Sequence, residues 1–163
     1  MSIIDPELML TVPEHITAST GFDVFTHSFE AYIHKNTSPY IEILALEAIR
    51  LVAEHLYTAV KDGSNIEARS AMSWADTLAG LSIANAGVTL PHGIAMAIGG
   101  NCPHIMHGEA LAAVYPECMR FTYSNAIQKF AVLARVFNDD IIMKYLGLIP
   151  FFKCLLIDDF LKK

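Results

Sequence analysis

The sequence predicts an all-α protein organised as a helical bundle. Apolar residues recur at helical spacing along most of the chain, and Ser, Pro and Gly stand where helices are expected to begin and end. No segment alternates convincingly between apolar and polar residues. With 53% hydrophobic and only 17% charged residues in a chain of 163, a packed core is expected rather than a disordered chain.

Two long helices are expected first, over residues 13–33 and 38–61. Pro13 fits the opening turn of the first helix, which we expect to be interrupted or tightened near Gly21. Ser38-Pro39 opens the second, with serine as the cap and proline at the first helical position. The second helix is apolar on most sides, and its charged residues fall on one narrow stripe. A helix of this kind is buried on most sides, so a further partner surface is expected.

The rest of the chain predicts four more helices. Ser64 is expected to cap the first of them, because Glu67 stands at capping-box spacing, and this helix ends at residues 85–87. Three shorter helices follow, with Gly99-Gly100-Asn101 closing the first of the three. Their expected ranges are 91–98, 107–116 or slightly beyond, and 125–137.

Composition excludes several classes of protein. The chain has 11 basic and 17 acidic residues, and this formal net charge of -6 argues against a nucleic-acid partner. The uncharged stretch from Thr77 to Gly108 is broken by Gly, Pro, Asn and His, so we expect no membrane span. No signal peptide is visible, and the three cysteines have no CxxC spacing. Reduced thiols in a cytoplasmic protein are therefore expected.

Asp23 and His27 form the first candidate metal pair. They are four residues apart, so both side chains lie on one face of the expected helix. The alternative is a solvated aspartate beside a capping or core histidine, and D-x-x-x-H is common by chance. The neighbouring Phe22, Phe25 and Phe29 weaken that alternative, because an aspartate among apolar residues needs a strong partner such as a metal.

His92 and His107 each stand directly before glycine, and each begins a short expected helix. A following glycine allows close approach of the backbone. The alternative is that both are ordinary helix-start residues in tight turns. His104 lies in the loop without such a glycine, so a structural role is expected for it. His15, His34 and His55 are expected at the surface or at helix ends; they belong to the total of seven histidines.

Together, Asp23, His27, His92 and His107 offer one carboxylate and three imidazoles. This mixed set of oxygen and nitrogen donors suits Fe(II) or Zn(II) better than Ca(II) or Mg(II). Spacing and composition alone lead no further than this.

These motifs resemble those of the iron-containing alcohol dehydrogenases, from about Ile4 to Asn138. Residues 20–32 resemble the family's helix that supplies an Asp and a His to the metal, and residues 45–51 resemble a helix further along. Residues 85–93 resemble the second signature, and His107-Gly108-Glu109-Ala110 resembles the last metal-ligand motif.

The resemblance implies the helical, metal-binding half of a two-domain dehydrogenase of the dehydroquinate synthase-like type. It implies that Asp23, His27, His92 and His107 are the metal ligands. It also implies a small alcohol or aldehyde as substrate, with NAD or NADP as the hydride carrier of the complete enzyme.

Three departures from the family pattern matter. Met96 stands where many members have a further histidine close to the nicotinamide. No Gly-rich pyrophosphate loop is visible, so the cofactor domain is expected to be missing from this chain. Residues 139–163 do not resemble the family's closing helices. We therefore expect a helical metal-binding domain over residues 1–138 and a divergent tail over 139–163.

Two alternatives to a simple enzyme fragment stay open. The chain could work with a separately made nucleotide-binding domain or as a homo-oligomer, because its apolar surface exceeds what one small bundle covers. Alternatively, it is a non-catalytic truncated remnant or a helical structural module, for which no metal would be found.

Overall fold

The computed structural model describes residues 3–137, which form six α-helices and one short 3₁₀ helix without a strand. The predicted all-α class is therefore confirmed for this part of the chain. The expected tail, residues 139–163, lies outside the described residues. The elements are η1 (Pro6–Met9), α1 (Glu14–Ile33), α2 (Pro39–Lys61), α3 (Ile66–Ala86), α4 (Leu90–Asn101), α5 (His107–Tyr123) and α6 (Ile127–Val136).

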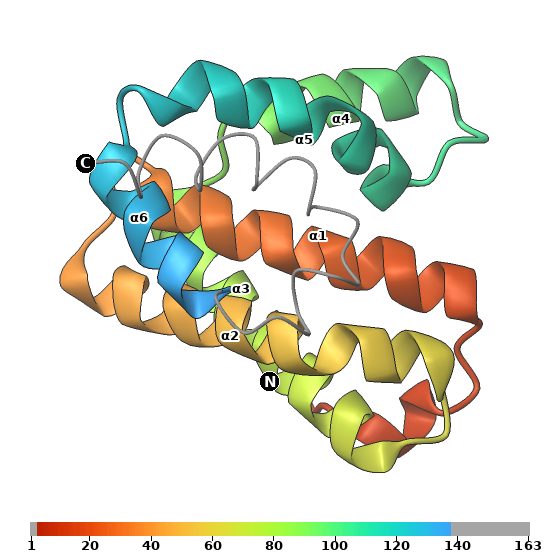
Figure 1. Cartoon of the computed structure of the whole chain (residues 1–163). Helices are drawn as coiled ribbons and strands as arrows, with labels where there is room; N and C mark the ends of the chain where they lie inside the picture. The colour runs from red at the N-terminus through yellow and green to blue at the C-terminus, as the bar shows by residue number, and fades with distance from the viewer. Residues whose placement is uncertain (1–2, 138–163) are drawn as a thin grey trace.

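Helix α1 runs through the middle of the bundle. It packs against α2 and α3 on one side and against α5 on the other, while α4 pairs with α5 (Figure 1). Its buried aromatic residues, Phe25 and Phe29, form edge-to-face contacts with Tyr115 of α5. Phe29 and Phe25 also contact Phe130 of α6 and Phe137 respectively, so one aromatic cluster joins three helices. This burial fixes the side of α1 that remains for polar residues.

The expected break near Gly21 is wrong, because α1 is helical throughout. Glycine serves packing here instead: a Cβ atom at this position would lie 2.2 Å from Cδ1 of Leu56 on α2. The missing side chain lets α1 and α2 approach each other closely. Pro13 lies just before the helix as its N-cap rather than inside the first turn.

Helices α4 and α5 begin within one residue of their predicted starts but run further, whereas α6 is shorter at both ends than the predicted range 125–137. Helix α4 continues through Gly99 and Gly100 to Asn101, and α5 continues past Pro116 to Tyr123. Pro116 removes one amide donor, but Ala112, four residues earlier, is on the exposed face, where water can replace the lost bond. Helix α3 ends as expected, since Gly87 adopts a positive φ of 91° that favours glycine.

The start of α3 differs from the prediction. Asn65 is its N-cap and accepts a hydrogen bond from the backbone N–H of Ala68 at 3.0 Å. The Ser64 hydroxyl instead donates to the Asp62 carboxylate at 2.6 Å. Ser64 and Asn65 are adjacent, and either side chain could serve as the N-cap of α3, so local spacing does not decide between them.

Replacing Asn65 with alanine is expected to lower the free energy of unfolding by about 1 kcal/mol, because the first turn of α3 loses its cap. Ser64→Ala, which removes only an exposed hydrogen bond, should have a smaller effect. Urea denaturation followed by circular dichroism measures both. Equal losses in the two variants would contradict the assignment of the cap.

Helix α2 is buried along most of its length, as its apolar sequence predicts. The charged stripe is half-exposed, with Arg50 forming ion pairs to Glu47 and Glu54. Ile43 nevertheless remains 70% exposed, and Tyr40 and Tyr57 are also exposed. Among residues 3–137, no single helix has the length and hydropathy to cross a bilayer; α3 and α4 pass that test only as a pair bent by 103°.

Candidate metal centre

Three helices bring the four predicted ligands to one place. Asp23 and His27 lie one turn apart on α1, as the spacing predicts. His92 lies in the first turn of α4, just after Pro91, and His107 is the first residue of α5. Because α5 packs on α1 and α4 packs on α5, the two helix starts face the polar side of α1.

Asp23 is at the centre of the cluster. Its Oδ1 atom lies 3.3 Å from Nε2 of His92, 3.6 Å from Nε2 of His27 and 3.9 Å from Nε2 of His107. One donor atom each from Asp23, His92 and His107 falls within 4.8 Å of the others. Such spacing is compact enough for one ion to be held between them.

His27 stands slightly apart from this group of three. It is not among the donors that converge within 4.8 Å. Its ring stacks on that of His92, with ring centroids 4.7 Å apart and planes 18° apart. The structure therefore brings all four residues into contact but only three of them into mutual ligand distance.

His92 shows the strongest sign that the cluster fits a cation. Its ring is buried, and Nδ1 lies 2.7 Å from Oε1 of Glu30. Nε2 faces Asp23 but has no hydrogen-bond partner within residues 3–137. A buried imidazole nitrogen without a partner is costly, and a metal ion is a natural partner for it. The residues present therefore fit a divalent ion of the Fe(II) or Zn(II) type.

The pKa values of Asp23, His27 and His92 reflect how closely these side chains lie together. Burial alone would raise the pKa of Asp23, but the contact with His92 and the charges of the other histidines lower it overall. Burial lowers the pKa of His27 despite the nearby Asp23 carboxylate. Burial also acts to lower the pKa of His92, but the carboxylates of Asp23 and Glu30 raise it to about 9. The carboxylates thus concentrate negative charge where a cation is expected.

Close contact between α1 and α5 positions His107. A Cβ atom on Gly108 would lie 2.1 Å from the backbone oxygen of Ser19 on α1. Only glycine allows this approach, which places His107 over Asp23. Gly93, the glycine after His92, has nothing within 4 Å of its Cβ position. The expectation of close backbone approach therefore holds for Gly108 and is wrong for Gly93.

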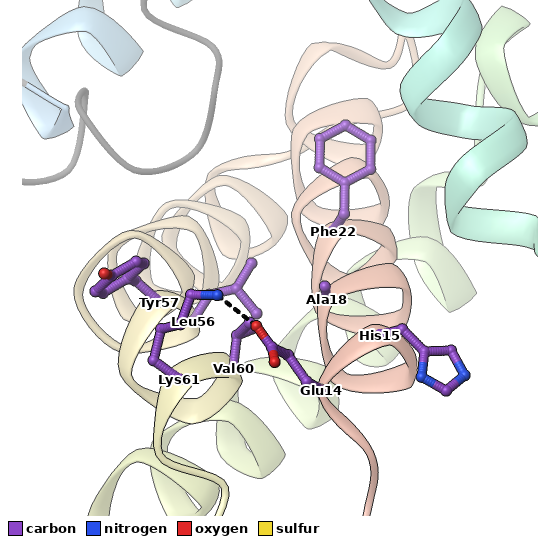
Figure 2. Close-up of a pocket in the computed structure, with 8 residues that line it drawn as sticks. All are labelled: Glu14, His15, Ala18, Phe22, Leu56, Tyr57, Val60 and Lys61. Carbon is purple, nitrogen blue, oxygen red and sulfur yellow. Dashed lines mark hydrogen bonds and ion pairs between the residues drawn. The ribbon is translucent and has the colours of Figure 1, made fainter.

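Two cavities border α1. One, of about 580 Å³, reaches Asp23 and His27 and is lined by apolar residues of the N-terminal segment, including Ile4 and Leu8. The other, of about 600 Å³, lies between the start of α1 and the end of α2, where Lys61 and Glu14 form an ion pair (Figure 2). No predicted ligand lines the second cavity. Of these two cavities, the first is the one that reaches predicted ligands.

Sequence reasoning missed Glu30 as a site residue. Its side chain is fully buried, and it contacts the His92 ring at the base of the cluster. A signal was present, because Glu30 follows Asp23 by seven residues and His27 by three, which places all three on one face of a helix. A charged residue in that apolar stretch needed a partner, as Asp23 did.

Comparison with known proteins identifies the family. The sequence profile described as "Fe-containing alcohol dehydrogenase family, C-terminal" matches residues 17–145, which is most of the chain. The chain belongs to this family. All four predicted ligands lie inside the matched range, and the matched region is the C-terminal part of the family's proteins.

A curated relative also matches most of this chain with only part of its own length. "Long-chain-alcohol dehydrogenase 1" of Geobacillus thermodenitrificans is 41% identical over 138 residues, which are 85% of this chain and 34% of the relative. The chain therefore spans about a third of the length of this relative.

Solved structures of the family share the fold. An archaeal alcohol dehydrogenase from a Red Sea brine pool superposes with a TM-score of 0.83 at 35% identity, covering 94% of this chain and 41% of that one. A sulfoacetaldehyde reductase from Bifidobacterium kashiwanohense, solved with NAD+, has a TM-score of 0.79 at 31% identity over 93% of this chain and 40% of that one. The helical bundle is thus the fold of the matched part of these two enzymes.

Proposed function

We propose that the chain is the metal- and substrate-binding part of an iron-type alcohol dehydrogenase that interconverts alcohols and aldehydes with NAD or NADP. One observation supports this most directly: the buried Nε2 of His92, which has no hydrogen-bond partner within residues 3–137, lies in a group with Asp23 and His107 at mutual ligand distance. Membership of the family, and the NAD+ bound by the Bifidobacterium relative, support the proposed reaction class.

The proposed ligands are Asp23, His27, His92 and His107, with Fe(II) or Zn(II) as the ion. His27 is included because its Nε2 lies 3.6 Å from the Asp23 oxygen that the other two histidines also face. The ion, when bound, would supply Lewis-acid polarisation of the oxygen of the alcohol or aldehyde. The carboxylates of Asp23 and Glu30 would offset its charge, and the three neutral rings would add none.

The cavity beside Asp23 and His27 suits a small alcohol or aldehyde. Its volume is about 580 Å³, and its walls include Ile4, Leu8 and Val24. The apolar walls would contact the carbon chain of the substrate, and polar residues of α3, including Arg69 and Asp76, also line the cavity. Asp23 and His27 would thereby orient the oxygen-bearing carbon toward the cluster.

The nicotinamide cofactor needs a further domain. A dinucleotide is typically held by a unit made of a strand, a Gly-rich loop and a helix. Residues 3–137 contain no strand and therefore no such unit. Met96, one turn after His92 on α4, is 66% exposed and has no ionisable group, whereas many family members are expected to have a histidine at this position. We propose that a nucleotide-binding domain or a second copy covers part of the exposed apolar surface.

The purified chain is expected to be a poor dehydrogenase or none by itself. NAD(P)H formation from a series of primary alcohols should rise when a nucleotide-binding domain from a family member is added in trans. Rapid turnover by the isolated chain would contradict the assignment of the cofactor to another domain. Absence of both turnover and bound metal would favour the alternative, a truncated remnant or structural module.

Metal affinity is expected to rise with pH up to about pH 9. The ion binds the deprotonated ring nitrogen, so it must displace a proton that His92 holds because its pKa is raised to about 9. Below that pH, each unit of acidity should weaken the apparent affinity by up to about tenfold. Zn(II) dissociation constants, measured against a competing chelator between about pH 6 and 9, test this. A constant affinity across the range would contradict it.

A further inference from the structure

Glu30 is a fully buried carboxylate whose two oxygens have different partners. Oε2 accepts hydrogen bonds from the backbone N–H of Thr89 at 2.5 Å and from the Thr89 hydroxyl at 2.9 Å. Oε1 lies 2.7 Å from Nδ1 of His92. Thr89 is the N-cap of α4, but its hydroxyl makes no capping bond and is used by Glu30 instead. The carboxylate thus ties α1 to the start of α4 at the ligand itself.

We propose that Glu30 is a positioning residue that holds the proton of the neutral His92 ring on Nδ1 and leaves Nε2 free to bind the ion. The backbone N–H of Thr89, which donates to Oε2 at 2.5 Å, holds Glu30 in place. This inference rests on the proposed function, since it concerns the same metal site.

The chemistry of the partners sets the direction of this effect. An ionised carboxylate only accepts hydrogen bonds, so Nδ1 must donate to Oε1. A neutral imidazole has a single N–H group, and Nε2 is then left with its lone pair. Nε2 is the nitrogen that faces Asp23 and lacks a hydrogen-bond partner within the described residues. A carboxylate behind a ligating histidine fixes ring orientation in metal sites in this way.

Glu30→Gln should reverse the tautomer without changing the shape of the residue. The Thr89 backbone N–H can only donate, so the amide oxygen of glutamine must stay at the Oε2 position. The amide NH₂ group then occupies the Oε1 position and donates to Nδ1 of His92. The ring proton must move to Nε2, where it blocks the ion. A comparable acid-to-amide change behind a histidine leaves the geometry intact and imposes the wrong tautomer.

The experiment compares wild type, Glu30→Gln and the control Thr89→Val. The control removes the hydroxyl bond to Oε2 but keeps the backbone bond and the carboxylate beside His92. Zn(II) dissociation constants are measured for all three, together with unfolding of the metal-free proteins. Ring ¹⁵N chemical shifts of His92 in the metal-free proteins, recorded where the ring is neutral, report which nitrogen has the proton.

The expected result is a 10- to 100-fold weaker Zn(II) affinity in Glu30→Gln, roughly the range for a changed partner behind a ligand. Thr89→Val should stay much closer to wild type. The ¹⁵N shifts should place the proton on Nδ1 in wild type and control and on Nε2 in Glu30→Gln. Unchanged affinity in Glu30→Gln, or an equal loss in the control, would overturn the proposal while leaving the metal site itself intact.

Two further outcomes distinguish a failure of the proposed function from a failure of the proposed role of Glu30. If wild type binds no Zn(II), the proposed function fails, but the ¹⁵N shifts still decide whether Glu30 holds the proton on Nδ1. If Glu30→Gln does not fold, the wild-type spectrum decides alone. A proton on Nε2 in wild type would overturn the role of Glu30.

Discussion

Gly108→Ala is expected to lower the free energy of unfolding by about 1–3 kcal/mol, as overpacking of a tight contact does. The added Cβ would lie 2.1 Å from the Ser19 backbone oxygen and 2.7 Å from the Ser19 carbonyl carbon. These are backbone atoms in the middle of α1, so they cannot rotate away as a side chain can. Helices α1 and α5 must therefore separate, and His107 moves away from Asp23 with them.

Gly93→Ala is the matched control for this variant. It also changes the glycine that follows a proposed ligand, but its Cβ position has nothing within 4 Å. Gly93 lies in helix α4 on the exposed side, so alanine should stabilise the protein by up to about 1 kcal/mol. Urea denaturation of the metal-free proteins measures both changes. The same sign and size in both variants would show that the contact between Gly108 and Ser19 is not tight.

His107→Ala is expected to weaken metal binding by about 100-fold or more, above the cost of changing a residue behind a ligand. His107 is one of three donors that converge within 4.8 Å, and its side chain is 40% exposed. Removing a half-exposed ring should cost the metal-free fold little. His107→Ala should therefore weaken metal binding while leaving stability nearly unchanged, whereas Gly108→Ala should lower both. Zn(II) titration and thermal unfolding of the same sample measure the two effects.

His104→Ala is the control for His107→Ala. His104 lies three residues earlier, in the loop before α5, and is exposed. It is not part of the converging donor group. Its replacement should leave Zn(II) affinity unchanged. If His104→Ala weakened binding as much as His107→Ala, the site would involve the loop rather than the four proposed ligands.

The helices could be predicted from the sequence because their signals are local. Ser38-Pro39 and Asn85-Ala86-Gly87 mark ends that the structure reproduces. Asn65 and Ser64 are adjacent and chemically similar as caps, so the sequence could not rank them. The packing role of Gly21 depends on its contact with Leu56 of another helix, and local sequence does not reveal that contact.

The site could be predicted only in part. The pairing of Asp23 with His27 follows from helical spacing, and the structure brings both toward His92 and His107. The distances between ligands depend on how closely α5 approaches α1, which Gly108 and Ser19 determine. Glu30 was missed because its partners, Thr89 and His92, are about sixty residues away in sequence. Long-range contacts of this kind follow from packing and not from local pattern.

The metal content of the purified wild-type chain tests the central claim most directly. The protein would be exposed to Fe(II) without oxygen, or to Zn(II), dialysed, and analysed by elemental mass spectrometry with His107→Ala beside it. A single ion per chain in wild type, and its loss in His107→Ala, is the result predicted from the convergence of Asp23, His92 and His107. A folded wild-type chain that retains no more metal than the variant would contradict the assignment of this cluster as a metal centre.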